Sequence, residues 1–258
     1  MTIDYIIYSV DDNPLYAGFW KFISKWTKER MGVTPVLFHI TDEETDFYED
    51  DFGLVKKFKS LPDFTTSLQC RMVRMWGTRF FQNEFCMIGD IDMMMVDKSY
   101  FFRNLNEYPE NSLVIYTSDA YDKSRPECIN EYAQDRYPIC YNLAKGSVFE
   151  QILNTERDFE EYLSEASSHG FLTDHIDELY YGKRVNVNAF NPDINIVYLK
   201  RGYRSFFVCP NRFERPILLN HEEQYQLINK KIIDIHLPRP YEDFELFIQI
   251  IKEQVLTL

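Results

Sequence analysis

The chain lacks the sequence features that mark membrane-spanning, secreted or zinc-stabilised proteins. No apolar run approaches the ~20 residues that a transmembrane helix needs, and the first residues have no signal-peptide pattern. The cysteines are odd in number and have no paired spacing of the kind used by zinc sites or disulfide frameworks: Cys70, Cys86, Cys128, Cys140 and Cys209. We therefore expect a cytoplasmic protein with reduced thiols.

Positive charge is also scarce. The formal net charge of the 258 residues is −13, which argues against a general nucleic-acid-binding surface. An acidic protein that binds an anionic substrate needs local help from a metal ion or from placed arginines. Internal repeats and low-complexity linkers are absent, so the length fits one large α/β domain. Aromatic residues are plentiful, with 18 Tyr and 21 Phe, and this surplus suits stacking on bases or sugar rings as well as core packing.

The first forty residues have a strand–helix–strand pattern. Residues 3–10 predict a strand, Asn13 and Pro14 suit the start of a helix that runs to about residue 30, and residues 34–40 predict a second strand. Such a unit predicts a parallel sheet. Because ligands bind at the carboxyl ends of strands in these sheets, we expect the end of the first strand on the rim of a ligand site: Ser9, Val10 and Asp11.

The segment Phe85–Val96 is the most informative stretch of the chain. Two apolar runs enclose the triplet Asp90-Ile91-Asp92, and the first run has the uninterrupted apolar character of a buried parallel strand. Buried carboxylates must be paired or bound to a cation, and residues two apart in extended chain share one side. Asp90 and Asp92 therefore predict a Mg²⁺ or Mn²⁺ site completed by phosphates and water. Solvated turns also contain such triplets, but the apolar runs favour an interior position here.

Two other segments supply charged groups for such a site. Residues 64–81 predict an amphipathic helix that leads into the Asp90 strand and carries Arg71 and Arg74 as surface neighbours. Arg71 is the better candidate for a bidentate diphosphate contact, and a surface pair is the alternative. Residues 173–181 predict a capped helix with three acids on a shared face, each of which also fits a solvated surface: Asp174, Asp177 and Glu178. Together they are the best further source of a catalytic carboxylate.

The C-terminal part provides a candidate for a third metal ligand. In residues 231–240, Asp234 and His236 alternate with isoleucines and so point to one face, before prolines end the element. A lone histidine is usually structural, but this one ends an apolar run near Arg239, and we expect it to be a ligand. Residues 241–258 predict an amphipathic closing helix.

The order and spacing of these segments resemble those of a metal-dependent glycosyltransferase of the GT-A fold. A nucleotide-type strand–helix unit is followed by the arginine-bearing helix, the Asp-x-Asp triplet, the segment Tyr141–Gly146, the acidic helix and the late histidine. We expect a strand at residues 137–142 and then a turn at 143–147, whose small residues allow close approach to a ligand. The resemblance implies a single α/β domain with a Rossmann-like, mixed and mainly parallel sheet flanked by helices. Residues 1–97 would form its nucleotide-binding half and residues 98–258 its acceptor-side half.

The resemblance also implies roles for individual residues. Asp90, Asp92 and His236 would hold Mn²⁺ or Mg²⁺ on the diphosphate of a UDP- or GDP-linked sugar, and one of the three helix acids would face the reacting carbon. The other donor-site positions would line the nucleoside, the phosphates or the sugar: Ser9, Val10, Asp11, Arg71, Asp90, Ile91, Asn142, Ala144 and Lys145. The implied reaction moves a sugar to a hydroxyl acceptor such as a glycan, with inversion and retention both open.

Three alternatives differ in where these motifs should lie. A haloacid-dehalogenase-type phosphatase places its Asp-x-Asp on the first strand, whereas this triplet is mid-chain and precedes Met93. A sugar-nucleotide pyrophosphorylase needs a Gly-rich basic turn after the first strand, and Ser9–Asn13 has neither Gly nor Arg. A non-catalytic carbohydrate- or nucleotide-binding protein would leave Asp90, Asp92 and His236 apart. On the transferase reading, the acceptor would lie near Arg212, Arg215, Phe206 and Phe207.

Overall fold

A computed structural model gives the fold of the chain. It describes residues 1–43, 52–121, 136–168, 175–202, 211–216, 223, 226, 232–239, 244, 245 and 247–249.

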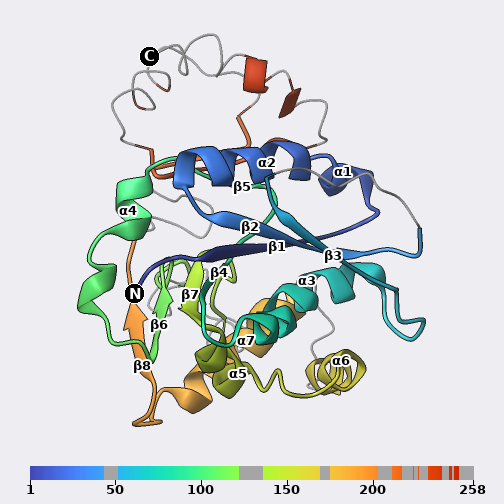
Figure 1. Cartoon of the computed structure of the whole chain (residues 1–258), viewed down its shortest axis with the longest axis vertical. Coiled ribbons are helices and arrows are strands. Elements are labelled where there is room, and N and C mark those ends of the chain that lie inside the picture. Colours follow the sequence, from blue (N-terminus) through green and yellow to red (C-terminus); the bar gives the residue numbers. More distant parts are fainter. Residues whose placement is uncertain are drawn as a thin grey trace.

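A seven-stranded mixed sheet forms the centre of the molecule (Figure 1). The strand order is β3-β2-β1-β4-β7-β6-β8. Neighbours run parallel from β3 to β4 and between β6 and β8, while β7 is antiparallel to both β4 and β6. The strands are β1 Tyr5–Asp11, β2 Thr34–Ile40, β3 Leu54–Phe58, β4 Phe85–Ile88, β6 Ser112–Ile115, β7 Asn142–Lys145 and β8 Asn195–Tyr198. The predicted fold class, a mixed and mainly parallel α/β sheet, is confirmed.

Helices cover both faces of this sheet (Figure 1). One face carries α1 Pro14–Ala17, α2 Trp20–Trp26 and a π-helical turn Thr27–Met31. The other carries α3 Thr66–Trp76 with a 3-10 turn Gly77–Phe81, α5 Gly146–Leu153, α6 Phe159–Ser168 and α7 Ile176–Asn188. The short helix α4 Lys98–Phe102 and a 3-10 turn Leu105–Glu107 precede β6. The single helices predicted over 14–30 and 64–81 are thus both divided.

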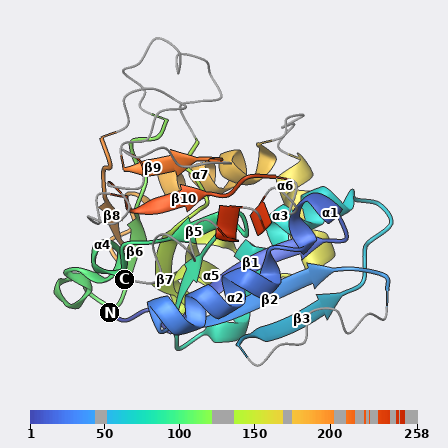
Figure 2. The same cartoon turned by 90° about the horizontal axis from the view of Figure 1, so that it is seen from above.

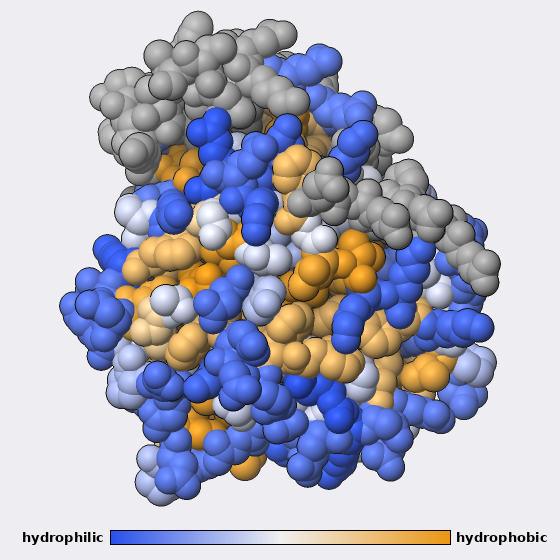
Figure 3. Space-filling model, in the orientation of Figure 1, coloured by the Kyte–Doolittle hydropathy of each residue, from blue (hydrophilic) through white to orange (hydrophobic). Residues whose placement is uncertain are grey.

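Two hydrophobic cores, one on each face, explain why the strand sequences lack polar alternation. Along β1, Tyr8 and Val10 join the core under α2, whereas Ile7 joins the core under α3, α5, α6 and α7. Burial on both faces favours apolar residues at most positions of the strand. On the side of the molecule seen in Figure 3, hydrophilic residues cover much of the surface, with apolar patches between them.

A second, three-stranded sheet joins distant parts of the chain (Figure 2). Its strands are β5 Met93–Met95, β9 Arg212–Glu214 and β10 Asp234–His236, in the order β5-β10-β9. β10 is antiparallel to β5, and His236 pairs with Met93 directly after the Asp-x-Asp triplet. This pairing brings the predicted late histidine to Asp92.

The structure differs from the prediction around β7. The strand begins at Asn142, after Tyr141 adopts a left-handed φ of 60°, and α5 follows at Gly146. A Cβ on Gly146 would lie 2.0 Å from the carbonyl oxygen of Phe81. The small residue therefore allows two backbones to approach each other, instead of allowing a ligand to approach.

Few residues of the predicted closing helix are described. Those that are, residues 244, 245 and 247–249, are helical, and the rest of 241–258 lies outside the described residues. None of the described helices combines the length and apolar character that crossing a bilayer requires.

Candidate functional site

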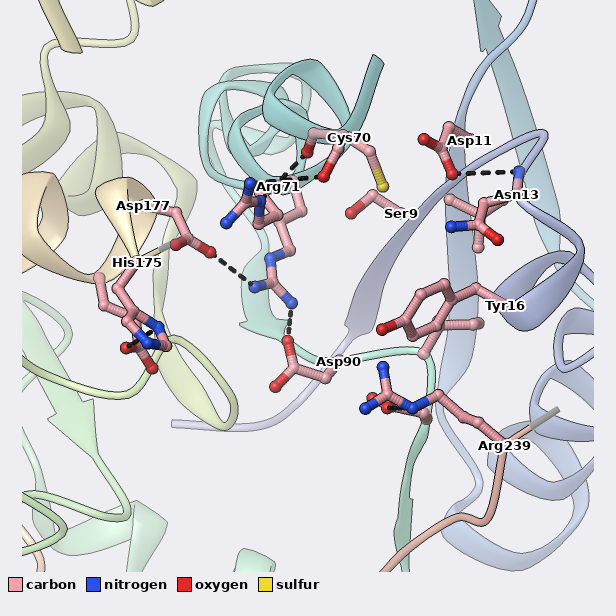
Figure 4. Close-up of a pocket in the computed structure, with 16 residues that line it drawn as sticks. Ser9, Asp11, Asn13, Tyr16, Cys70, Arg71, Asp90, His175, Asp177 and Arg239 are labelled. Atoms are coloured by element: carbon pink, nitrogen blue, oxygen red, sulfur yellow. Dashed lines mark hydrogen bonds and ion pairs between the residues drawn. The ribbon is translucent and has the colours of Figure 1, made fainter. Parts of the chain in front are cut away.

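A cavity of about 580 Å³ lies at the carboxyl ends of β1 and β4 (Figure 4). Both strands leave the sheet at this edge because they are parallel, with Ile7 beside Ile88. Tyr16 and Arg239 lie on one side of the cavity, and His175 and Asp177 lie on the other. The structure brings nine of the predicted residues to the cavity lining: Ser9, Val10, Asp11, Arg71, Asp90, Ile91, Asp92, Asp177 and Glu178.

The end of β1 is tied to the start of α3. Asp11 accepts a hydrogen bond of 3.0 Å from the hydroxyl of Thr66 and one of 3.2 Å from the backbone N–H of Asn13. The thiol of Cys70, on α3, is half-buried beside Ser9, and loss of solvation raises its pKa to about 12. This side of the cavity is therefore a preformed wall of short polar groups.

Arg74 connects the triplet with the acidic helix. Its buried guanidinium forms an ion pair with Asp90, donates to the carbonyl oxygen of Gly89 at 3.0 Å and lies 3.5 Å from Asp177. We expected Arg71 to be the more important arginine. Arg71 does line the cavity, but it donates hydrogen bonds to the carbonyl and hydroxyl oxygens of Ser67, one turn back on the same helix. Helix α3 thus turns Arg74, not Arg71, toward both carboxylates.

Asp92 and His236 meet through the small sheet. The carboxylate Oδ2 of Asp92 is 3.1 Å from Nε2 of His236, and the backbone N–H of Leu237 donates to the carbonyl oxygen of Asp92 at 2.7 Å. On the other side of the ring, Nδ1 of His236 is hydrogen-bonded to Glu214. A carboxylate behind the ring is the usual way to orient a metal-binding imidazole.

The charges around this pair shift the pKa values of both His236 and Asp92. Burial disfavours the imidazolium of His236, but its hydrogen bonds to Asp92 and Glu214 outweigh burial and raise its pKa to about 9. Burial likewise disfavours the Asp92 carboxylate, but His236 and Arg215 outweigh it and hold the pKa of Asp92 below its ordinary value. Asp92 is therefore an anion in a strongly cationic setting.

Two arginines from separate segments complete that setting. Nη2 of Arg215 lies 3.3 Å from Oδ2 of Asp92 and is in direct contact with Nε2 of His236. Nε of Arg239 lies 3.8 Å from the same oxygen, with its guanidinium over the ring of Tyr16 at 4.9 Å. We had placed Arg215 on the acceptor side. The structure places it at the triplet instead, because Arg215 follows β9, which pairs with the His236 strand.

These residues fit a divalent cation in part. Within the part of the chain that the structure describes, no group of three or more His, Cys, Asp or Glu side chains is arranged to hold a metal. Asp92 and His236 converge as a carboxylate–imidazole pair, a donor set that suits Mn²⁺. The third predicted ligand, Asp90, faces the cavity but is paired with Arg74. A cation could thus use two converging ligands, whereas Oδ1 of Asp90 is already paired with Arg74.

Glu178 is the acid with the most perturbed environment. The Tyr121 hydroxyl donates to its carboxylate and lies 2.8 and 2.9 Å from the two oxygens. Nε of Arg136 donates to it at 3.2 Å, and His175 lies 3.5 Å away. Burial and the charge of Asp177 raise the pKa of Glu178 to about 7, against the opposing effect of Arg136. Sequence reasoning missed Tyr121 and Arg136 as partners because they come from separate segments. Asp174, the other predicted acid, lies outside the described residues.

Ala144 and Lys145 do not reach the cavity. They pair with Cys86 and Phe85 at the beginning of β4, so antiparallel pairing carries them away from the triplet. Ala144 is fully buried in a core, and Lys145 forms a 3.1 Å ion pair with Glu110. The structure corrects the expectation that they border the transferred sugar.

Asn142 is also a structural residue here. It pairs with Ile88 at the end of β4, but its buried side chain donates to the carbonyl oxygens of Pro138 and Ile139 at 2.8 and 2.7 Å. It therefore fixes the preceding loop and does not line the cavity.

The remaining acceptor-side candidates are also accounted for. Arg212 is paired with the buried Asp234 at 2.9 Å and so stabilises the small sheet. Phe206 and Phe207 lie outside the described residues.

Comparison with known proteins establishes the fold. No protein-family model and no curated protein matches the sequence. A solved structure of the galactosyltransferase LgtC with donor and acceptor sugar analogues aligns at a TM-score of 0.52 and 11% identity, over 90% of this chain and 86% of LgtC. A structure of an active-site mutant of LgtC aligns at 0.52 and 10% identity, over 95% of both chains. The glycosyltransferase GlyE of Streptococcus pneumoniae TIGR4 aligns at 0.46 and 10% identity, over 76% of this chain and 45% of its own. The chain therefore has the fold of the glycosyltransferase LgtC, as the resemblance to GT-A enzymes predicted.

Proposed function

We propose that the protein transfers a sugar from a nucleotide-diphosphate sugar to a hydroxyl acceptor, with Mn²⁺ or Mg²⁺ as cofactor. One observation carries this proposal. In a fold shared with LgtC, a single cavity at the carboxyl ends of the parallel strands contains both triplet carboxylates, several arginines and Glu178. That LgtC structure contains donor and acceptor sugar analogues, and we propose that this cavity takes the corresponding parts of its own substrates. The acceptor is proposed to be a glycan or another hydroxyl compound.

The donor would be held by groups from three sides. Asp11 and Ser9 would contact the nucleoside, and the ring of Tyr16 is placed to pack against a base. Asp92 and His236 would hold the cation. When bound, the cation would stabilise the charge that develops on the leaving diphosphate. Arg71 and Arg239 line the cavity and would bind phosphate oxygens, for which a guanidinium fork is well suited. Arg215, which is paired with Asp92 beside the cavity, would do the same.

Glu178 would act on the sugar or the acceptor. It lines the same cavity as Asp90, on the wall formed by α7. As a carboxylate it would stabilise positive charge on the sugar carbon or take the proton of the acceptor hydroxyl. Asp177 would act with it through Arg74, which links Asp177 to Asp90.

A binding experiment tests the proposal. We expect UDP or GDP to raise the melting temperature in the presence of Mn²⁺ and to do so much less in its absence. A panel of nucleotide sugars, assayed for hydrolysis with Mn²⁺, would then identify the donor. Absence of any shift with either nucleotide would contradict a transferase and favour a non-catalytic carbohydrate-binding protein.

The cytoplasmic location is a further proposal. It rests on the cysteine pattern, and Cys70, Cys86 and Cys140 are free thiols in the structure.

Glu178 gives a pH prediction with two readouts. The folded chain keeps the Glu178 proton up to about pH 7, whereas the ordinary carboxyl value is 4.5. The unfolded chain therefore loses this proton first, so the Glu178 contribution makes the free energy of unfolding fall as the pH rises from 4.5 to about 7. Urea unfolding across this window should show a smaller fall for Glu178→Gln than for the wild type. Transfer by the wild type should rise through about pH 7 as the carboxylate forms.

Glu161→Gln is the matched control for this prediction. Glu161 is an exposed acid on α6, so this variant removes the same charge away from the cavity. Its stability and activity should follow the wild-type pH curves. A Glu178→Gln curve that coincides with the wild type in both readouts would refute the assigned role.

A further inference from the structure

Arg215 occupies the point where the two converging metal-ligand atoms meet. One nitrogen of its guanidinium, Nη2, lies 3.3 Å from Oδ2 of Asp92 and is in direct contact with Nε2 of His236. Those two atoms are themselves 3.1 Å apart. A cation bound by both atoms on the side that faces Arg215 would overlap with this guanidinium nitrogen. The site therefore already contains a positive charge, and the chain itself supplies it.

The backbone directs Arg215 to this point, while its side chain is partly exposed. The N–H of Arg215 donates to the carbonyl oxygen of His236 at 2.7 Å, and its φ is 47°, in the left-handed region. Nη1 donates to the carbonyl oxygen of Leu237 at 3.3 Å. The side chain is 30% exposed, and its partner Asp92 lines the cavity. The strand pairing that positions His236 therefore also positions Arg215.

Charge balance decides when the guanidinium stays and when it moves. Without a ligand, the buried Asp92 needs a counter-charge, and Arg215 provides one together with His236. A divalent cation at the same point would repel the guanidinium at close range. A diphosphate brings new negative charge beside the cation, and a planar guanidinium binds phosphate oxygens well. Arg215 would then exchange its ion pair with Asp92 for one with the diphosphate.

We propose that Arg215 is an internal counter-ion that occupies the metal position between Asp92 and His236, and that it transfers to the diphosphate when the metal and nucleotide bind. This inference rests on the proposed function and extends it to the order of binding. Metal alone competes with Arg215, whereas metal together with a nucleoside diphosphate gains from it. Removing the guanidinium therefore has opposite effects on the two binding steps.

The test uses Arg215→Asn and Arg215→Gly, because asparagine and glycine both tolerate a left-handed backbone. Mn²⁺ alone is titrated into each full-length protein by electron paramagnetic resonance. UDP and GDP are then titrated by calorimetry at saturating Mn²⁺. We expect both variants to bind Mn²⁺ roughly tenfold tighter and the nucleotide roughly tenfold weaker than the wild type, as for the loss of one charge-assisted contact. Arg103→Asn removes a charge at an exposed position and should change neither affinity.

The outcomes separate this inference from the proposed function. A wild type that binds no Mn²⁺, even with UDP or GDP, defeats the proposed metal site itself. If the wild type binds Mn²⁺ but both folded variants bind it equally well or more weakly, Arg215 is not a competitor and the inference fails. Tighter Mn²⁺ binding without weaker nucleotide binding would overturn the transfer to the diphosphate. Circular dichroism establishes which variants are folded, and the glycine variant replaces the asparagine variant if the latter is not.

Discussion

Asp92→Asn is expected to remove Mn²⁺-dependent nucleotide binding and to lower sugar transfer by roughly 100- to 1,000-fold, the loss seen when one key charge-stabilising group is removed from an active site. Oδ2 of Asp92 contacts His236, Arg215 and Arg239, at distances of 3.1, 3.3 and 3.8 Å. Removing its charge weakens a metal ligand. It also removes the carboxylate with which Arg215, Arg239 and His236 form ion pairs. Melting-temperature shifts with UDP or GDP and Mn²⁺, followed by transfer rates, measure both effects.

The asparagine variant should still fold, which makes the binding result interpretable. The amide has nearly the same shape, and the backbone bond from Leu237 to the carbonyl oxygen of Asp92 does not involve the side chain. Asp193→Asn, which removes an equal charge at an exposed position, serves as the control and should keep wild-type binding. Full Mn²⁺-dependent binding by Asp92→Asn would show that the cation, if there is one, is held elsewhere.

The parts of the fold that could be predicted from the sequence are those with a local signal. Both faces of β1, β2 and β4 are buried, so each strand is a continuous apolar run that stands out against polar loops. The triplet ends such a run and lines the cavity as predicted. His236 was predicted as a ligand because it is a histidine at the end of an apolar run. The pairing of β10 with β5 brings it to Asp92.

The parts that could not be predicted depend on register and on long-range pairing. Arg74 and Arg71 are three residues apart on one helix, and only the packing of α3 decides that Arg74 meets Asp90. The contact between Arg215 and Asp92 spans 123 residues and exists because β9 pairs with β10. Lys145 was misplaced because the antiparallel register of β7 runs away from the triplet. A single sequence has no local feature that encodes these pairings.

Asp234 is the clearest case of a residue whose role only the structure reveals. Its carboxylate is fully buried and accepts four hydrogen bonds of 2.7–3.0 Å from Arg201 and Arg212. Burial opposes its ionisation, but the two guanidiniums outweigh burial and lower the pKa of Asp234 to about 2. The sequence placed Asp234 on the same face as His236, which is correct for alternating strand positions, but it gave no sign of this arginine pair.

Asp234→Asn is expected to lower the free energy of unfolding by about 3–5 kcal/mol, the usual cost of removing one partner from a buried ion pair. Arg201 and Arg212 would remain in place with side chains only 1% and 10% exposed, so neither guanidinium could regain full hydration. Urea denaturation at neutral pH measures the loss, and the exposed Asp193→Asn change should stay within about 0.5 kcal/mol.

The same substitution should also weaken the metal site, because Asp234 and His236 lie two positions apart on β10 and share its pairing with β5 and β9. Mn²⁺ affinity should therefore fall along with stability, whereas a purely local defect would leave the affinity unchanged.

A triple variant that combines Arg201→Met, Asp234→Leu and Arg212→Met tests the reason for the loss of stability. If the penalty comes from uncompensated charge, this apolar triple variant should be more stable than Asp234→Asn, since replacing all members of a buried ionic group is often neutral or better. A triple variant less stable than the single one would instead mean that the hydrogen bonds themselves hold the small sheet together.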